Sequence, residues 1–172
     1  MRLERAALED FDLIYSEKEK NFVPEERRDR EFAFRIMSEP NYTVYHVIDG
    51  ETKIGFITVW DLGAFAYIEH FVIYELYRNR GYGGRTLEIL KEMYERMVLE
   101  AEPPTDELRS RRIAFYERNG FSKNDYPYLQ PPYRKGETRV PLVLMSYPSR
   151  LENCKESADA IYYGIIHGET EK

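Results

Sequence analysis

The stretch YIEHFVIYELYRNRGYGGRTLEIL, from Tyr67 to Leu90, decides the fold of this chain. Its first part is rich in β-branched and aromatic residues, its middle holds three glycines, and its last part has apolar residues at helical spacing. The stretch therefore predicts a strand, a glycine-rich turn and a helix in succession. Such a turn can bind phosphate, because its backbone N–H groups and the positive end of the helix dipole face the same anion.

The residues of the turn separate the known kinds of phosphate site. A P-loop is excluded, because no Lys-Ser or Lys-Thr pair follows the glycines. The dinucleotide fingerprint GxGxxG also fails, because its sixth position holds Thr86. Three arginines bracket the turn and can add charge-assisted hydrogen bonds to a pyrophosphate. The residues expected to bind it are Arg78, Asn79, Arg80, Gly81, Tyr82, Gly83, Gly84 and Arg85.

Composition limits the classes of function. The length of 172 residues fits one compact domain. Acidic residues outnumber basic ones by 31 to 25, and the resulting charge of −6 disfavours nucleic acid as a partner. The single cysteine, Cys154, excludes a disulfide framework and suits a reducing compartment, and the sequence shows neither a signal peptide nor a membrane span. We therefore expect a cytoplasmic protein without a membrane partner. No metal is expected either, because His46 and His167 have no ligand partners at useful spacing.

The first third of the chain predicts a strand, two helices and a hairpin. Apolar residues at helical spacing indicate the helices, and alternation indicates the strands. Pro24 suits the first position of the second helix, and Asp49-Gly50 is a strong signal for a hairpin turn. The expected elements are a strand at Met1–Ala6, a helix through Phe11, Ile14 and Tyr15, a helix from Pro24 to the residue before Pro40, and strands at Tyr42–Ile48 and Lys53–Asp61.

The remainder of the chain predicts elements on both sides of the glycine turn. A strand, a helix and another strand this close together imply a parallel pair joined by a right-handed crossover. The aromatic, proline-stiffened segment Asp125–Tyr133 is interpreted as a loop. The expected elements are a strand at Ala64–Ile73, a helix with the stripe Leu87, Leu90, Met93, Tyr94 and Met97, a strand at Val98–Glu102, a helix capped by Thr105 and ended by Asn119-Gly120, and a strand at Arg139–Tyr147.

Two motifs in this order resemble the GNAT superfamily of N-acetyltransferases. The first, Arg78 to Gly83, resembles the R/Q-x-x-G-x-G/A signature by which that superfamily holds the pyrophosphate of acetyl-coenzyme A. The second, the segment AFYERNGF from Ala114 to Phe121, resembles its FYE-x-x-GF motif, which lies on a helix beside the coenzyme. Two motifs separated by a helix and a strand are more specific than either alone. The resemblance, with the flanking strands, covers the chain from Met1 to Tyr147.

The resemblance implies an α/β fold, that of the GNAT acyl-CoA N-acyltransferases. Its sheet is mixed and mostly antiparallel, with about six to seven strands flanked by helices, and its fourth and fifth strands are parallel and splay around the cofactor. We expect residues 1–148 to form this domain and residues 149–172 to form a C-terminal extension, helical and packed on the domain. The sequence leaves open whether the extension only covers the domain or mediates association, for instance in a homodimer.

The resemblance also assigns roles to matching residues. The backbone of Phe71, Val72 and Ile73 is expected to pair with the pantetheine arm of acetyl-coenzyme A, the acyl donor. Tyr116 matches the tyrosine that commonly protonates the leaving thiolate. Many relatives carry asparagine seven residues before that tyrosine, and here this position is Arg109, a departure from the pattern.

The implied reaction is direct attack of a primary amine on the acetyl thioester. An amine is mostly protonated near pH 7, so a base must accept its proton. Glu69 is the predicted base, because it lies among apolar neighbours just before the cofactor-binding backbone, on the side of Tyr67 and Phe71. His70, predicted to point to the opposite side, is the second candidate. The alternative role for Glu69 is structural, as a partner in a cross-strand ion pair or as a carboxylate at the sheet edge.

The acceptor amine, a small molecule or a protein amino group, is not identified by the sequence. The segment Phe22–Phe34 is expected to cover its pocket, and the tyrosines of the later loop to border it. Those tyrosines are Tyr126, Tyr128 and Tyr133. Two other functions stay open: a non-catalytic acyl-coenzyme A binding or sensing module, and an unrelated phosphate-binding regulator. The second of these leaves the FYERNGF segment unexplained, and Tyr116 together with Glu69 favours an enzyme over the first.

Overall fold

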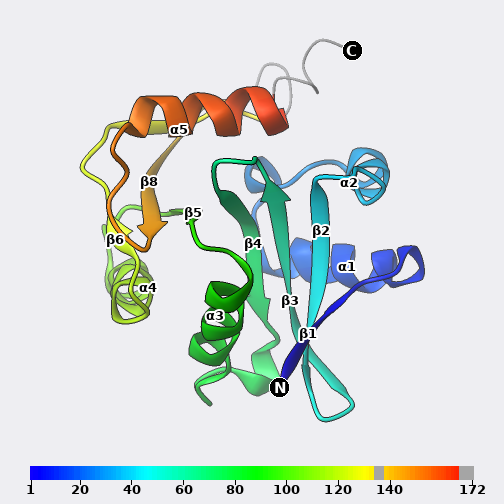
Figure 1. The fold of residues 1–172 in the computed structure, drawn as a ribbon. Coiled ribbons are helices and arrows are strands. Elements are labelled where there is room, and N and C mark those ends of the chain that lie inside the picture. The colour runs from blue at the N-terminus through cyan, green and yellow to red at the C-terminus, as the bar shows by residue number, and fades with distance from the viewer. Residues whose placement is uncertain (134–137, 167–172) are drawn as a thin grey trace. The chain divides into compact units, whose positions relative to one another are not determined.

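The computed structural model describes residues 1–133 and 138–166, and the chain divides into two compact units (Figure 1). Unit 1 comprises Met1–Asp61 and Ile68–Met93, and unit 2 comprises Leu62–Tyr67 and the chain from Tyr94 onward. Among the described residues, no helix is both long and apolar enough to cross a membrane. The expected division between residues 148 and 149 stays a prediction.

The sheet of unit 1 has the strand order β1-β2-β3-β4 (Figure 1). The pairs β1–β2 and β2–β3 are antiparallel, and Gly50 turns the hairpin between β2 and β3 with φ of 59°. The predicted hairpin is therefore confirmed. The strands are β1 Arg2–Arg5, β2 Tyr42–Asp49, β3 Thr52–Asp61 and β4 Ala66–Ile73, of which the first two residues of β4 belong to unit 2.

The helices of unit 1 differ from the predicted ones at one place. The single helix expected from Pro24 is wrong: the chain forms a short 3-10 helix and then, after a break, a separate α-helix. The break arises because Asp29 is extended and caps the second helix, its Oδ1 accepting a hydrogen bond from the N–H of Phe32 at 2.9 Å. The helices are η1 Leu8–Asp10, α1 Phe11–Asn21, η2 Pro24–Glu26, α2 Arg30–Ile36, η3 Glu75–Tyr77 and α3 Tyr82–Met93.

The core of unit 1 is formed where helices meet the sheet. Phe11, Tyr15 and Ala33 form a buried cluster between α1 and α2, and Met37 packs against it. Side chains that are fully buried at the sheet and α3 are Val47, Phe56, Ile57, Leu87 and Leu90. Removing each from water contributes about 1.5–3 kcal/mol to folding.

Unit 2 holds the start of β4 and the strands that follow it, in the order β4-β5-β8-β6, with β7 paired to β8 (Figure 1). The N–H of Ala66 donates to the carbonyl of Arg96 at 2.9 Å, where β4 and β5 run parallel as predicted. All three strands that pair with β8 run antiparallel to it. The predicted mixed sheet is therefore confirmed. The further strands are β5 Met97–Ala101, β6 Ser122–Lys123, β7 Tyr128–Gln130 and β8 Val140–Tyr147.

Three sequence predictions in unit 2 need correction. Met97, assigned to the stripe of the preceding helix, begins β5. The segment 125–133, expected as a loop, contains β7, because Tyr128 and Gln130 turn inward while their strand pairs with β8. The helix α4, Glu107–Arg118, is capped by Asp106 and not by Thr105, since Asp106 accepts from the N–H of Arg109 at 2.8 Å.

The described part of the C-terminal extension is helical. α5 spans Cys154–Ile161 and continues as a π-helical turn, Tyr162–Ile166. Ile161 is fully buried and Ala158 is 8% exposed, so α5 buries one of its faces.

Candidate functional site

The glycine-rich turn of unit 1 connects η3 to α3. Asn79 and Gly81 adopt left-handed backbone conformations, with φ of 61° and 77°. A Cβ atom added at Gly81 would meet nothing within 4 Å, so the backbone conformation and not crowding favours glycine there. The first N–H of α3 that bonds back within the turn is that of Arg85, to the carbonyl of Gly81 at 3.2 Å. The N–H groups of residues 82–84 precede it in the first turn of α3, where an α-helix leaves its backbone donors without partners in the helix.

Two of the three arginines at the turn are held by contacts within unit 1. Arg78 donates from Nε to the carbonyl of Ile73 at 2.9 Å and from Nη2 to the side chain of Asn21 at the end of α1. Arg85 lies over the ring of Tyr82, 4.5 Å from its centre. The hydroxyl of Tyr82 donates to Asp49 at 2.7 Å. Hydrogen bonds thus connect the turn to β4, to α1 and to the hairpin. Arg80, the third arginine, is exposed.

The predicted pantetheine-pairing residues lie at the end of β4. Val72 is buried, and Phe71 and Ile73 are half-buried. The carbonyl of Ile73 already accepts from Arg78, so its pairing with a pantetheine amide would compete with that contact. The adjacent strand approaches closely at Gly55, where an added Cβ would lie 2.2 Å from the carbonyl oxygen of Val72.

Glu69, the predicted base, is in a buried ion pair with Arg28. Their side chains are 0% and 2% exposed, and Nη1 of Arg28 donates to Oε1 of Glu69. Burial alone would raise the pKa of the carboxyl, but the Arg28 guanidinium and then the His70 contact outweigh it, so the pKa of Glu69 lies well below its usual value. Glu69 is therefore ionised near neutral pH. The sequence left open a cross-strand ion pair, but Arg28 lies in the connector between η2 and α2 and not on a strand, and the role of Glu69 as a base stays a prediction.

The side chain of His70 does not point away from Glu69, so that prediction is wrong. Its Nδ1 lies 3.4 Å from Oε2 of Glu69. Its Nε2 faces the carbonyl of Glu26 at 3.2 Å, and its Nδ1 lies 3.2 Å from the hydroxyl of Thr58. Burial lowers the pKa of His70, and the charge of Lys18 adds to this effect, so the ring is neutral. A simple alternation of side chains fails here because both buried polar groups find partners on the segment 26–28.

A buried lysine beside this pair was missed by the sequence analysis. Lys18 of α1 is 6% exposed, and its Nζ donates to the hydroxyl of Tyr42 at 3.2 Å. Burial lowers the pKa of Lys18 to about 8, which the charge of Glu69 partly opposes. The signal was present, because Lys18 continues the stripe of Phe11, Ile14 and Tyr15 at helical spacing. A lysine on a buried stripe is unusual enough to be a candidate functional residue.

In unit 2, Tyr116 lies in the last turn of α4. It is 9% exposed, and its ring packs edge-on against Phe115 and Phe121 at centroid distances of 5.2 and 5.8 Å. Burial raises the pKa of Tyr116 to about 12, so its phenol keeps its proton near neutral pH. Arg109 lies in the first turn of the same helix. It donates from Nε to Glu102 at 2.8 Å and is ion-paired with Asp106. The arginine that replaces the family's asparagine is thus engaged within its own unit.

Glu100 on β5 is a carboxylate that, unlike Glu69, was not predicted from the sequence as a site residue. It accepts hydrogen bonds from Tyr67 at 2.9 Å, from Gln130 at 2.6 Å and from Tyr128. Its partners come from β4 and β7, and the sequence did not predict β7, so no local signal could have found this cluster. Of the tyrosines expected to border the acceptor pocket, Tyr128 hydrogen-bonds to Glu100, and Tyr133 is buried, with 5% of its surface exposed. Within the described ranges, no group of three or more His, Cys, Asp or Glu side chains is placed to hold a metal ion.

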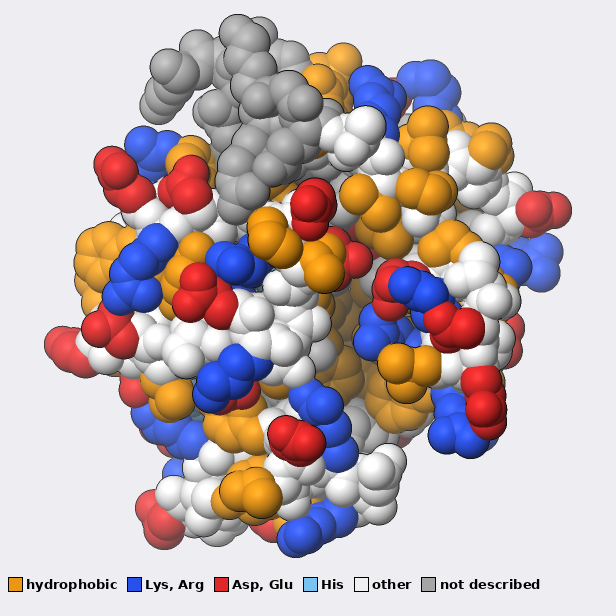
Figure 2. Space-filling model, turned by 180° about the vertical axis from the view of Figure 1, so that it is seen from behind, with side chains coloured by type: hydrophobic (Ala, Val, Ile, Leu, Met, Phe, Trp, Pro, Cys, Tyr) orange, Lys and Arg blue, Asp and Glu red, His pale blue; other side chains and the backbone are white. Residues whose placement is uncertain are grey.

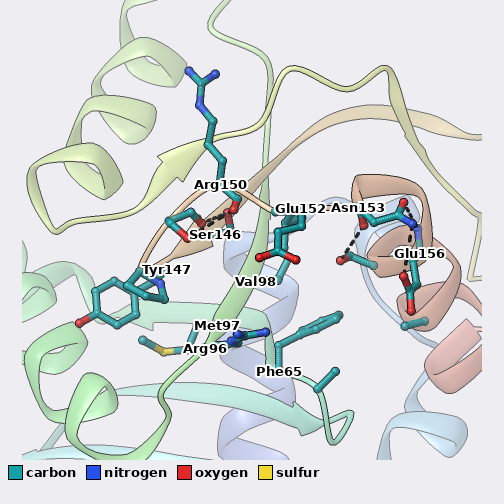
Figure 3. Close-up of a pocket in the computed structure, with 16 residues that line it drawn as sticks. Phe65, Arg96, Met97, Val98, Ser146, Tyr147, Arg150, Glu152, Asn153 and Glu156 are labelled. Carbon is teal, nitrogen blue, oxygen red and sulfur yellow. Dashed lines mark hydrogen bonds between the residues drawn. The ribbon is translucent and has the colours of Figure 1, made fainter.

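Two cavities are lined by described residues of unit 2. The first, about 320 Å³, lies where β5 begins, β8 ends and α5 starts, and it holds none of the predicted site residues. Figure 3 shows the carboxylate of Glu152 directed toward Val98, while the side chain of Arg150 extends away from both. The second, about 340 Å³, is bordered by Tyr126 and Tyr128. Tyr126 therefore lines a cavity, and the expectation that it borders the acceptor pocket stays a prediction.

The face of the molecule seen in Figure 2 carries side chains of both charges. Over the face seen in Figure 2, Lys and Arg side chains are interspersed with Asp and Glu. The net charge of −6 is therefore distributed and does not form a single acidic field on that face.

Comparison with known proteins gives three findings on this sequence and fold. Residues 40–123 match a family model described as an acetyltransferase (GNAT) domain. A solved GNAT-family protein from Bacteroides thetaiotaomicron is 32% identical to this chain, with 96% of this chain and 98% of that one covered and a TM-score of 0.91. No curated protein matches the chain.

Two more distant solved structures are similar in fold alone. The ribosomal-protein-S18-alanine N-acetyltransferase of Escherichia coli is 16% identical, with 90% of this chain and 97% of that one covered and a TM-score of 0.65. An aminoglycoside 6'-N-acetyltransferase, solved as a complex with coenzyme A, is also 16% identical, with coverage of 89% and 100% and a TM-score of 0.62.

Proposed function

This chain belongs to the GNAT acetyltransferase family, and on that premise we propose that it transfers an acetyl group from acetyl-coenzyme A to a primary amine. The observation that carries the proposal is the glycine turn of unit 1, whose left-handed Gly81 leads directly into α3. An N-terminal helical turn with open N–H groups and flanking arginines suits a pyrophosphate. The coenzyme A complex of the aminoglycoside acetyltransferase supports a donor of the same kind here.

The donor is proposed to bind through two parts of unit 1. The N–H groups at the start of α3 and the exposed Arg80 would hold the pyrophosphate, and the backbone at Phe71 and Val72 would pair with the pantetheine arm. Arg78 would remain near both, because its Nε contact to Ile73 keeps the guanidinium at the end of β4. The proposed contacts thus use groups that the turn already orients.

In the proposed chemistry, the amine nitrogen attacks the thioester carbon, the carbon–sulfur bond breaks, and coenzyme A leaves as a thiolate. Tyr116 donates a hydrogen bond or its proton to that thiolate, which is consistent with a phenol that stays protonated near pH 7. The nitrogen loses its proton to Glu69 or, through water, to solvent. Because Arg28 keeps the pKa of Glu69 low, Glu69 is a weak base, and we propose that it acts mainly by attracting the positive charge that develops on nitrogen.

A non-catalytic acyl-coenzyme A binding module is the second candidate. The buried ion pair of Glu69 favours it, because a carboxylate held by Arg28 is a poor proton acceptor. We also propose a cytoplasmic location, which suits the single Cys154. Association as a homodimer remains a prediction.

An amine-panel assay with acetyl-coenzyme A separates the two candidates. Released thiol is measured for each amine, and binding of coenzyme A is measured by calorimetry on the same preparation. We expect binding, together with thiol release for at least one primary amine. Binding without release for any amine would favour the non-catalytic module, and the absence of binding would contradict both.

A further inference from the structure

We propose that the acceptor amine also carries a carboxylate, and that Lys18 and the indole N–H of Trp60 bind this carboxylate in unit 1. The inference rests on the proposed acetyl transfer and deepens it by naming a substrate class, the amino carboxylates. Lys18 and Trp60 come from α1 and β3, and they flank Tyr42 of β2.

The ammonium of Lys18 lacks a carboxylate partner in the described part of the chain. Its contacts are a hydrogen bond to the hydroxyl of Tyr42, at 3.2 Å, and the face of the same ring, 5.9 Å from its centre. Lys18 is nevertheless only 6% exposed. A buried ammonium that is held by a neutral phenol leaves donor capacity for an anionic oxygen, because an ammonium has three N–H groups.

Trp60 supplies the second, independent observation. It is 4% exposed, and within the described residues its Nε1 has no hydrogen-bond partner. Its ring packs against Tyr42 at a centroid distance of 4.6 Å, and the guanidinium carbon of Arg28 lies 5.5 Å from it. A buried indole N–H without an acceptor is costly, so an acceptor atom from a ligand would be favourable.

The charges around these donors favour an anion over a second cation. Lys18 and Arg28 are both buried, and the charged group that acts on both is the carboxylate of Glu69. The positive groups therefore outnumber the negative one by two to one among these three residues. A carboxylate would offer one oxygen to the ammonium and one to the indole N–H.

The location agrees with a role in acceptor binding. Arg28 lies in the irregular connector between η2 and α2, inside the segment Phe22–Phe34 that the family resemblance places over the acceptor. This connector lies outside the helices η2 and α2, and it brings the guanidinium of Arg28 to Glu69. The amine of a bound amino carboxylate would then lie near Glu69, the neighbour of this cluster.

The test compares amino carboxylates with their amides, which differ only in the charge at one end. The acceptors are β-alanine, 4-aminobutyrate and 5-aminopentanoate, each with its amide, and kcat/KM is measured by thiol release. For at least one pair we expect the carboxylate to be preferred by roughly ten- to hundredfold, the range for hydrogen bonds to a charged group. Trp60→Phe keeps the aromatic packing and should reduce this preference about tenfold. Lys18→Met should abolish it.

Lys20→Met is the matched control, because it removes a lysine from the same helix whose side chain is 64% exposed. It should leave the preference unchanged. Equal kcat/KM for carboxylates and amides in the wild type would overturn the inference while leaving acetyl transfer intact. If Lys18→Met does not fold, Trp60→Phe decides alone, and an unchanged preference in that variant overturns the assignment.

A binding measurement keeps the test independent of turnover. Trp60 is the only tryptophan of the chain, so intrinsic fluorescence reports directly on its surroundings. Titration with the three amino carboxylates should change the emission, and titration with their amides should not. If no acceptor is acetylated, the proposed function fails, and the fluorescence titration then supports or overturns the carboxylate site by itself.

Discussion

Burial decides what Tyr116 can do. Its phenol has a pKa raised to about 12, so it holds its proton throughout the neutral range. A thiol of ordinary pKa, about 8.5, is a stronger acid than this phenol. Complete proton transfer to the thiolate is therefore uphill, and donation of a hydrogen bond as the sulfur gains charge is the more effective role.

Tyr116→Phe removes this donor and keeps the ring against Phe115 and Phe121. We expect turnover to fall by roughly 10²–10⁴, the usual range for a positioned acid, with affinity for coenzyme A nearly unchanged. Steady-state kinetics with the best acceptor and calorimetry with coenzyme A measure the two quantities. Tyr163→Phe, a change at a side chain that is 65% exposed in the same unit, is the control. Full turnover in a folded Tyr116→Phe variant would remove this residue from the mechanism, provided that chemistry limits the rate.

Single residues were predictable from the sequence only where a motif or a periodicity marked them. The motif identified Tyr116 and the glycine turn, and the stripe of α1 could have identified Lys18. The partner of Glu69 could not be predicted, because Arg28 is 41 positions away and no local pattern links the two. The same limit applies to Trp60, whose missing acceptor is visible only after folding.

At the scale of elements, Asp10 joins the start of α1 to the hairpin. Its Oδ1 lies 2.5 Å from Nζ of Lys53, and its Oδ2 lies 2.9 Å from Nε2 of His46. The hydrogen bond from Lys53 is the main cause that lowers the pKa of Asp10 to about 2, against an ordinary value of 3.8, and burial opposes it. A depressed carboxyl pKa stabilises the folded state above the unfolded-state value, and this stabilisation is lost as the pH falls toward the folded-state value.

Asp10→Asn should therefore reduce the free energy of unfolding at pH 6 by on the order of 1 kcal/mol, after discounting for solvent screening. The difference between wild type and variant should shrink as the pH falls from 4 to 2, because the wild-type carboxyl then becomes protonated. Urea unfolding at several pH values measures it. A difference that stays constant down to pH 2 would contradict the assigned contacts.

The close approach of β3 to β4 depends on Gly55. A Cβ at this position would lie 2.2 Å from the carbonyl oxygen of Val72 and 3.1 Å from Cα of Ile73, so the strands would have to separate. We expect Gly55→Ala to cost about 1–3 kcal/mol, as overpacking does, and to lower Tm by about 3–10 °C. Thermal unfolding followed by circular dichroism measures this shift.

Gly50→Ala is the control for Gly55→Ala. An added Cβ there meets nothing within 4 Å, and the cost of φ of 59° is about 1 kcal/mol. A Gly55→Ala variant as stable as the wild type would show that the two strands do not approach as closely as the structure has them.

Elements were predictable from the sequence where local chemistry specified them. The hairpin follows from Asp49-Gly50 and the alternation on both sides of it, and the strand, turn and helix around Gly81 follow from their own residues. β7 could not be predicted, because three residues become a strand only through pairing with β8. The helix expected from Pro24 failed because the cap at Asp29 competes with its continuation.

The two compact units share one strand, and this bears on the stability of the whole chain. The first two residues of β4 belong to unit 2 and the other six to unit 1. Neither unit can unfold without disturbing that strand. We therefore expect one cooperative thermal transition, as is usual for chains of this size.

A ligand that binds one unit should accordingly raise the Tm of the entire chain. Coenzyme A at about 100 times its Kd should add about 2.7 kcal/mol, which corresponds to about 5–10 °C for a chain of this size. Gly83→Val places a branched side chain in the first turn of α3, where the pyrophosphate is proposed to lie, and should abolish the shift without unfolding the protein. Differential scanning calorimetry measures both. Two separate transitions would contradict the coupling through β4, and an equal shift in Gly83→Val would contradict the pyrophosphate site.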